Sequence, residues 1–147
     1  MAHVRKQIRD RIAEVVTAGA TLVRRRVYTT RVYPLTADKL PAITVYTGSE
    51  NSALQTMGAR TLMRNLDVAV DIYVRATEKT DDDVDAIAVQ IEEAVANDFS
   101  VNGLAKSVVL TSTDIDFNAD AEQPIGIARL TFSVSYITAI NNVETAK

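Results

Sequence analysis

The fold is decided by residues 62–75, which read LMRNLDVAVDIYVR. Apolar side chains occupy one parity of this stretch: Leu62, Leu66, Val68, Val70, Ile72 and Val74. The other parity is mainly polar: Met63, Asn65, Asp67, Ala69, Asp71, Tyr73 and Arg75. Because strand side chains alternate between faces, the pattern predicts a strand with one dry and one wet face. A slip of one residue would bury Asp67 and Asp71, so the register is strongly specified.

The predicted strand is long for a chain of 147 residues. At about 3.3 Å per residue its length is about 46 Å, whereas a compact chain of this size has a radius of gyration of about 15 Å. The strand must therefore bend at a bulge or project beyond the body. A projecting strand needs a covering surface, which favours an oligomer.

Two amphipathic helices are expected to cover the dry face. Residues 2–18 place Val4, Ile8, Ile12, Val15 and Val16 at helical spacing, with Gly19 as the stop signal. Residues 80–97 repeat the pattern with Val84, Ile87, Ala88, Ile91, Ala94 and Val95. Thr80 is the expected N-cap of this second helix, and Asp81, Asp82 and Asp83 favour its first turn electrostatically.

The remaining elements are expected to be strands and connectors. Strands are predicted at 22–33, at 42–46, at 106–117 and at 125–139, with a connector over 35–40 and a polar turn over 118–124. In the 106–117 strand, one face is assigned to Val109, Thr111, Thr113, Ile115 and Phe117. Residues 48–60 show no periodicity and are interpreted as a long loop that orders against a neighbouring subunit. The prediction is a single α+β domain over 1–147, a mainly antiparallel sheet with two helices packed on one face, in the order α-β-β-β-α-β-β.

Charge is distributed unevenly along the chain. Residues 1–33 hold eight basic and two acidic residues, whereas the rest holds eight basic and seventeen acidic ones. Such asymmetry is compatible with nucleic-acid binding, with head-to-tail self-association, or with an ordinary solvated surface. For Arg24, Arg25 and Arg26, partner docking or intersubunit ion pairing ranks first, solvated surface second and nucleic acid third, because the whole chain has a pI of about 5.1.

The residues nominate no catalytic, cofactor-binding or metal site. His3 is the only histidine and there is no cysteine, so neither a Ser-His-Asp triad nor a Cys/His metal set can be assembled within the chain. The Asp81–Asp83 run lacks the spacing of a calcium loop and is explained by helix capping. No apolar run approaches the roughly 20 residues of a membrane span.

The ordered combination of elements resembles the tail terminator proteins of long-tailed bacteriophages, the minor tail protein U type. The matching stretches are PAITVY at 41–46, a segment bearing Glu50, LDVAVDIYV at 66–74, DAIAVQIEEA at 85–94 and ARLTFSVSYIT at 128–138, after a leading amphipathic helix.

The resemblance implies a non-enzymatic virion protein, made in the host cytoplasm. Members of this family form a hexameric ring at the head-proximal end of the tail tube, stop tube polymerisation and present the head-joining surface. The implied partners are copies of the chain, the tail tube protein and the head–tail connector (neck) protein, with DNA only as cargo through the lumen and no membrane.

The interface and lumen candidates are few. Expected interface residues are Arg24, Arg25, Arg26, Glu50, Leu54, Met57 and Arg64, and possible lumen-facing residues are Asp67 and Asp71. The alternatives are a neck, head–tail connector or tail completion protein, and a small nucleic-acid-binding or ligand-binding α+β domain.

Overall fold

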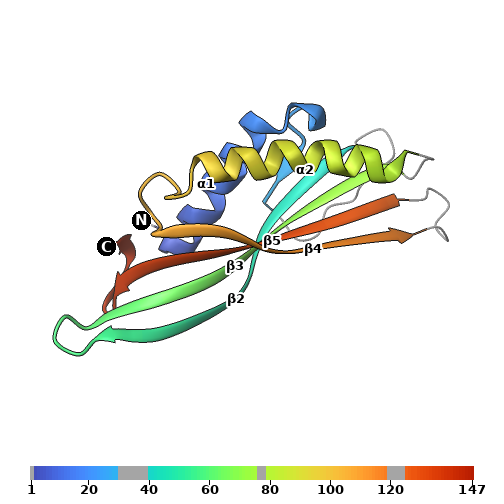
Figure 1. Ribbon diagram of the computed structural model, residues 1–147. Coiled ribbons are helices and arrows are strands. Elements are labelled where there is room, and N and C mark those ends of the chain that lie inside the picture. The colour runs from blue at the N-terminus through green and yellow to red at the C-terminus, as the bar shows by residue number, and fades with distance from the viewer. Residues whose placement is uncertain (1, 30–39, 76–78, 119–124) are drawn as a thin grey trace.

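The described part of the protein folds as two α-helices laid on one face of a curved sheet. The computed structural model describes residues 2–29, 40–75, 79–118 and 125–147. Figure 1 shows helices α1 (Val4–Gly19) and α2 (Thr80–Asn97) on the same side of the strands. The α+β class and the placement of both helices on one face are therefore as the sequence predicts. No helix in the described part is long and apolar enough to cross a membrane.

Within the described residues, the sheet has six strands in the order β1-β2-β3-β5-β4, with β6 paired to β5. Their bounds are β1 Val27–Tyr28, β2 Ala42–Thr56, β3 Thr61–Arg75, β4 Ser107–Asn118, β5 Ile125–Ala139 and β6 Asn142–Ala146. Only the β1–β2 pairing is parallel among these strands. Residues 62–75 lie in β3, the central strand of the sheet. β3 is paired along its length with β5 and along most of it with β2.

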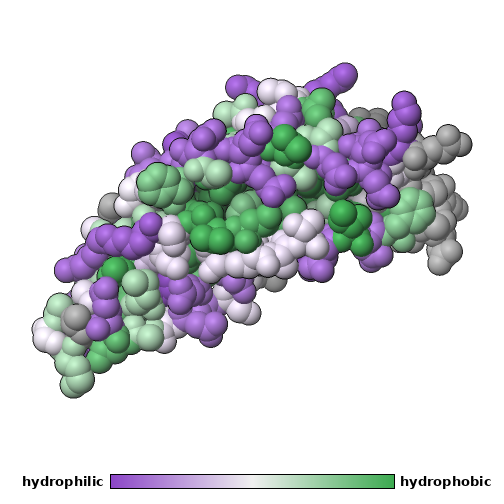
Figure 2. Space-filling view, viewed as in Figure 1, coloured by the Kyte–Doolittle hydropathy of each residue, from purple (hydrophilic) through white to green (hydrophobic). Residues whose placement is uncertain are grey.

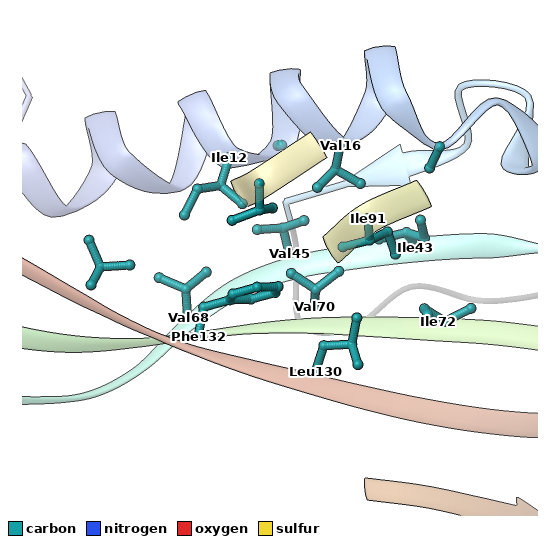
Figure 3. Close-up of a cluster of buried hydrophobic side chains, with 14 of the residues drawn as sticks. Ile12, Val16, Ile43, Val45, Val68, Val70, Ile72, Ile91, Leu130 and Phe132 are labelled. Atoms are coloured by element: carbon teal, nitrogen blue, oxygen red, sulfur yellow. The ribbon is translucent and has the colours of Figure 1, made fainter. Parts of the chain in front are cut away.

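The core lies between the helices and the sheet face beneath them. Leu66, Val68, Val70 and Ile72 on β3 are fully buried, and Val74 is 3 % exposed. On β5 the buried set is Ala128, Leu130, Phe132, Val134 and Tyr136. Figure 3 shows side chains of α1, α2 and the strands meeting in this layer. Each fully buried Val, Leu or Ile contributes about 1.5–3 kcal/mol relative to exposure, so this layer supplies the main driving force for folding.

The prediction of a loop at 48–60 is wrong. β2 continues to Thr56 and pairs with β3 through Leu54–Leu62, forming a long hairpin whose far end projects beyond the helices (Figure 1). A β-bulge between Thr47 and Glu50 interrupts the alternation, and residues 51–55 are exposed. A bulge shifts the parity, and a strand exposed on both faces has no apolar period to detect.

Over its described residues 22–29, the predicted strand at 22–33 is also largely wrong. Thr21–Val23 form a 3-10 turn that places Val23 in the core, and of the described residues 22–29 only Val27–Tyr28 join the sheet. Arg24 and Arg25 adopt left-handed backbone conformations, with φ of 51° and 67°. β-Branched and aromatic composition raised the strand propensity here, but the tertiary fold uses the segment as a turn. Residues 30–33, with most of the predicted connector and polar turn, lie outside the described residues.

Strand β4 departs from its predicted facing. A bulge between Leu110 and Ser112 reverses the alternation, so Val109 pairs beside Ser133 whereas Ile115 pairs beside the buried Ala128. The predicted single face from Val109 to Phe117 is therefore split between two faces. Strand β6 was not predicted, because its five residues include only half-buried or exposed side chains.

Both helix ends differ in detail from the prediction. Ala20, not Gly19, is the C-cap of α1, and Lys79, not Thr80, is the N-cap of α2, without a side-chain capping bond. Thr80 instead packs over Gly126, where an added Cβ would lie 2.5 Å from Thr80 Cγ2. Asp81, Asp82 and Asp83 do occupy the first turn of α2, where the helix dipole favours them.

We expect Gly19→Ala to destabilise the protein by about 1–3 kcal/mol. A Cβ at Gly19 would lie 2.5 Å from the Ala94 Cβ, so α1 and α2 would have to separate. This cost opposes the gain of about 1 kcal/mol in helix propensity. Chemical denaturation of Gly58→Ala is the control, because a Cβ there meets nothing within 4 Å. An increase in stability for Gly19→Ala would contradict the close helix contact.

Candidate functional site: the projecting hairpin and the groove between α2 and β4

The hairpin is fixed to the body by a buried polar network at its base. Glu50 Oε2 accepts hydrogen bonds from Arg5 Nη2 at 3.0 Å and from Arg64 Nη1 at 3.1 Å. The Tyr136 hydroxyl donates to Glu50 Oε1. Arg64 Nε donates to Thr138 Oγ1 at 3.0 Å. We call Arg5, Glu50, Arg64 and Tyr136 the hairpin-base network; it joins α1, β2, β3 and β5.

The sequence contained a signal for this network. Arg64 has the same parity as Leu62 and Leu66, so it is a charged residue on the dry side of β3. Its side chain is only 9 % exposed and that of Glu50 only 10 %. A buried guanidinium requires a carboxylate and further hydrogen-bond partners. Glu50 and Arg64, expected at an intersubunit interface, are thus bonded to each other inside the protomer.

The surroundings of Glu50 favour its charged form. Burial alone would raise the pKa of Glu50, but the hydrogen bond from Tyr136, the charge of Arg5 and the bonds from Arg5 and Arg64 outweigh burial and lower this pKa. Burial, together with the bond to Glu50, raises the pKa of Tyr136 to about 12. Burial and the charges of Arg5 and Arg64 lower the pKa of His3. The network therefore holds one anion between two cations at neutral pH.

A second polar network lies on the sheet face opposite the helices. Arg129 Nε and Nη2 donate to the two carboxylate oxygens of Asp71 at 2.9 and 3.2 Å, and the Tyr46 hydroxyl donates to Asp71 Oδ2 at 2.9 Å. The Arg129 guanidinium also lies 5.8 Å from the centre of the Tyr46 ring. Burial, together with the bond to Asp71, raises the pKa of Tyr46 to about 12. Arg129 and Tyr46 were not singled out by the sequence.

The two lumen candidates have different environments. Asp71 was expected on a wet face, but it is 2 % exposed because Arg129 and Tyr46 cover it. Asp67 is exposed on the same face. Only Asp67 of this pair presents its carboxylate to solvent in the protomer.

The three consecutive arginines do not form one patch. Arg24 and Arg25 are exposed in the turn after α1. Arg26 folds back instead and donates to the carbonyl oxygens of Pro41 at 2.9 Å and Leu40 at 3.3 Å. Arg26 therefore supports the start of β2, whereas Arg24 and Arg25 remain on the surface.

The end of the hairpin exposes apolar side chains beside one charge. Leu54 is 48 % exposed and Met57 is 82 % exposed. Arg60 is exposed, and it is the only charged residue between Glu50 and Arg64. In the part of the chain that the structure describes, no carboxylate lies within ion-pair distance of Arg60. We call Leu54, Met57 and Arg60 the hairpin tip.

A second uncovered surface lies between α2 and the edge strand β4. A groove of about 220 Å³ is lined by Glu92, Val95, Ala96, Val108, Leu110 and Phe132. Figure 2 shows apolar side chains gathered between these two elements. Farther along β4, Ile115 and Phe117 are 50 % and 52 % exposed. We call the six lining residues the α2–β4 groove. No sequence signal located it, because it depends on the pairing of β4 at the sheet edge.

These networks connect strands rather than offering free reactive groups. Glu50 and Asp71 are each bonded to an arginine and a tyrosine. Among the described residues, no three His, Asp or Glu side chains gather as a metal site would require. The α2–β4 groove, at about 220 Å³, is also smaller than the roughly 300–1,000 Å³ of typical small-molecule sites.

Comparison with known proteins places the chain in a family. One solved chain, described as "Virion of native gene transfer agent (GTA) particle", is 16 % identical over 90 % of each chain, with a TM-score of 0.42. No curated protein matches. The family model for phage minor tail protein U matches residues 2–136. This chain therefore belongs to the phage minor tail protein U family and is a structural tail protein of the virion.

Proposed function

We propose that this chain is the tail terminator: it forms a ring, with six copies as the expected number, at the head-proximal end of the tail tube. There it stops tube polymerisation and presents the surface to which the neck protein binds. The family match over residues 2–136 carries this proposal. The protomer itself adds two unlike uncovered surfaces, the hairpin tip and the α2–β4 groove.

Two unlike surfaces suit a closed ring. In a ring, each copy contacts its neighbours through two different patches, so the contact is heterologous. A twofold dimer would instead need one self-complementary patch. In this proposal, the sheet forms the body of the ring and one rim imitates a tube subunit.

The helix-free face of the sheet is proposed to line the lumen. It carries Asn65 and Asp67, which are exposed, and Ser133 and Ser135, which are half-buried. Arg129 lies on the same face, and its charge is paired with Asp71. Neutral and acidic groups bind phosphates weakly, because the affinity of a protein for DNA comes mainly from lysine and arginine side chains that neutralise the phosphates. Such a lining would let DNA pass without holding it.

The direct test adds the purified chain to polymerising tail tubes and measures tube length by electron microscopy. We expect tubes to shorten as the ratio of this chain to tube subunit rises, with an annular cap at one end. Tubes that are complete before the addition should keep their length. Unchanged lengths and uncapped ends would contradict the terminator role, and association with heads but not with tubes would indicate a neck protein.

A further inference from the structure

We infer that the hairpin tip of one copy docks into the α2–β4 groove of the next copy. The occupant of the groove is thus a second copy of this chain. This inference rests on the proposed ring, because it identifies the two surfaces that would close it. It adds which residues meet and which charges pair.

The two surfaces match in chemistry. The tip offers Leu54 and Met57, and the groove is lined with apolar side chains of Val95, Val108, Leu110 and Phe132. Burying exposed apolar surface on both sides provides the attraction, about 25 cal/mol per Å² removed from water. A groove of about 220 Å³ accommodates side chains from a narrow hairpin end.

The charges of the two surfaces are opposite. The tip carries Arg60 alone, whereas Glu92 lines the groove. Asp114 and Asp116 lie on the other face of β4, beside Arg129 and Ile127, so Glu92 is the charge that faces the groove. Neither residues 80–97 nor residues 107–118 contain a lysine or arginine. A complementary charge at the rim fixes register and disfavours wrong pairings. This complementarity is the reason for assigning the groove to a second copy.

The two surfaces cannot meet within one protomer. Phe132 in the groove is paired with Val68 on β3, seven residues from the start of β3 at Thr61. At about 3.3 Å per residue, the groove lies about 23 Å along the sheet from the tip. Each copy therefore carries the hairpin tip and the α2–β4 groove at separate places, as a head-to-tail ring requires.

Because the chain has no cysteine, disulfide cross-linking can test the contact without background. Met57→Cys on the tip and Ala96→Cys in the groove are made as separate variants; both side chains are exposed. Mixed under oxidation, alone and on tail tubes, they should give a covalent dimer, and a chain carrying both should give a ladder. Disulfides form only when Cα atoms come within about 7 Å.

The matched control pairs Met57→Cys with Ala86→Cys. Ala86 is also exposed on α2 but lies ten residues from Ala96, about 15 Å along the helix. Cross-linking of the Ala96 variant must exceed that of the Ala86 variant. Equal cross-linking, or a dimer formed by Met57→Cys alone, would overturn the assigned contact.

Charge exchange gives an independent readout. Arg60→Glu and Glu92→Lys should each weaken association about tenfold in sedimentation, or in tube capping if the free chain is monomeric. Combining them should restore association. A double variant no better than either single one would overturn the Arg60–Glu92 pairing. If the unmodified chain caps tubes but none of these effects appears, the docking inference fails and the proposed function stands; if it neither forms rings nor limits tube length, the proposed function fails.

Discussion

Glu50→Ala is expected to lower the free energy of unfolding by about 3–5 kcal/mol, the usual cost of removing one partner of a buried ion pair. The reason is Arg64, whose side chain is 9 % exposed and would be left without a carboxylate. Arg5 is less affected, because its side chain is 40 % exposed and can turn toward water. The Tyr136 hydroxyl, on a fully buried side chain, would also lose its acceptor.

Chemical denaturation of Glu50→Ala and of Glu93→Ala checks this expectation. Glu93 is an exposed residue of α2, where truncation should change stability by less than about 0.5 kcal/mol. If Glu50→Ala is no less stable than Glu93→Ala, the hairpin-base network makes no net contribution to the free energy of unfolding.

The same residue should give the fold an acid-sensitive component. Because the pKa of Glu50 is lowered in the folded state, its stabilisation is complete above the ordinary value of 4.5 and is lost as the pH falls through the folded pKa. Glu50→Gln should lack this component, so wild type and variant should converge in stability toward low pH. Parallel curves of stability against pH from 6 to 3 would contradict the assignment.

Phe132→Ala is expected to cost about 3–5 kcal/mol. Phe132 is 2 % exposed, lies among Val68, Val70 and Leu130 in the core (Figure 3), and also lines the α2–β4 groove. Removing the ring takes away its transfer free energy and leaves a cavity that β5, paired on both sides, cannot collapse to fill.

Phe117→Ala is the matched control for this second prediction, and urea denaturation measures both variants. It is the same substitution at a side chain that is 52 % exposed on the edge strand. Its effect should be well below that of Phe132→Ala, in line with other surface positions. Equal effects would mean that the floor of the groove is not part of the tightly packed core.

Long one-sided elements could be predicted from the sequence. β5 has the predicted bounds Ile125–Ala139, α2 has the predicted bounds Thr80–Asn97, and β3 begins one residue earlier than expected. In each of them, one apolar side persists for many residues, so the period is unambiguous. The sequence also predicted the α+β class and the two helices on one face.

β-Bulges could not be predicted from the alternation of apolar and polar residues. Because of the bulge between Thr47 and Glu50, the alternation pattern did not predict the second half of β2. The bulge between Leu110 and Ser112 places Ile115 and Phe117 on the helix side of the sheet. One extra residue reverses every later side chain, and nothing local in the composition marks it. Gly19 was recognised as special, but its role in the approach of α1 to Ala94 depends on tertiary packing.

The sequence by itself determined the central strand, its dry face and the helices that cover it, because those follow from local periodicity. Only the tertiary structure decided which charges meet: Glu50 with Tyr136, 86 residues apart, and Asp71 with Arg129, 58 residues apart. Such pairs are set by strand register, and register is a long-range property. The hairpin tip and the α2–β4 groove likewise exist only because distant strands pair side by side and leave one end and one edge uncovered.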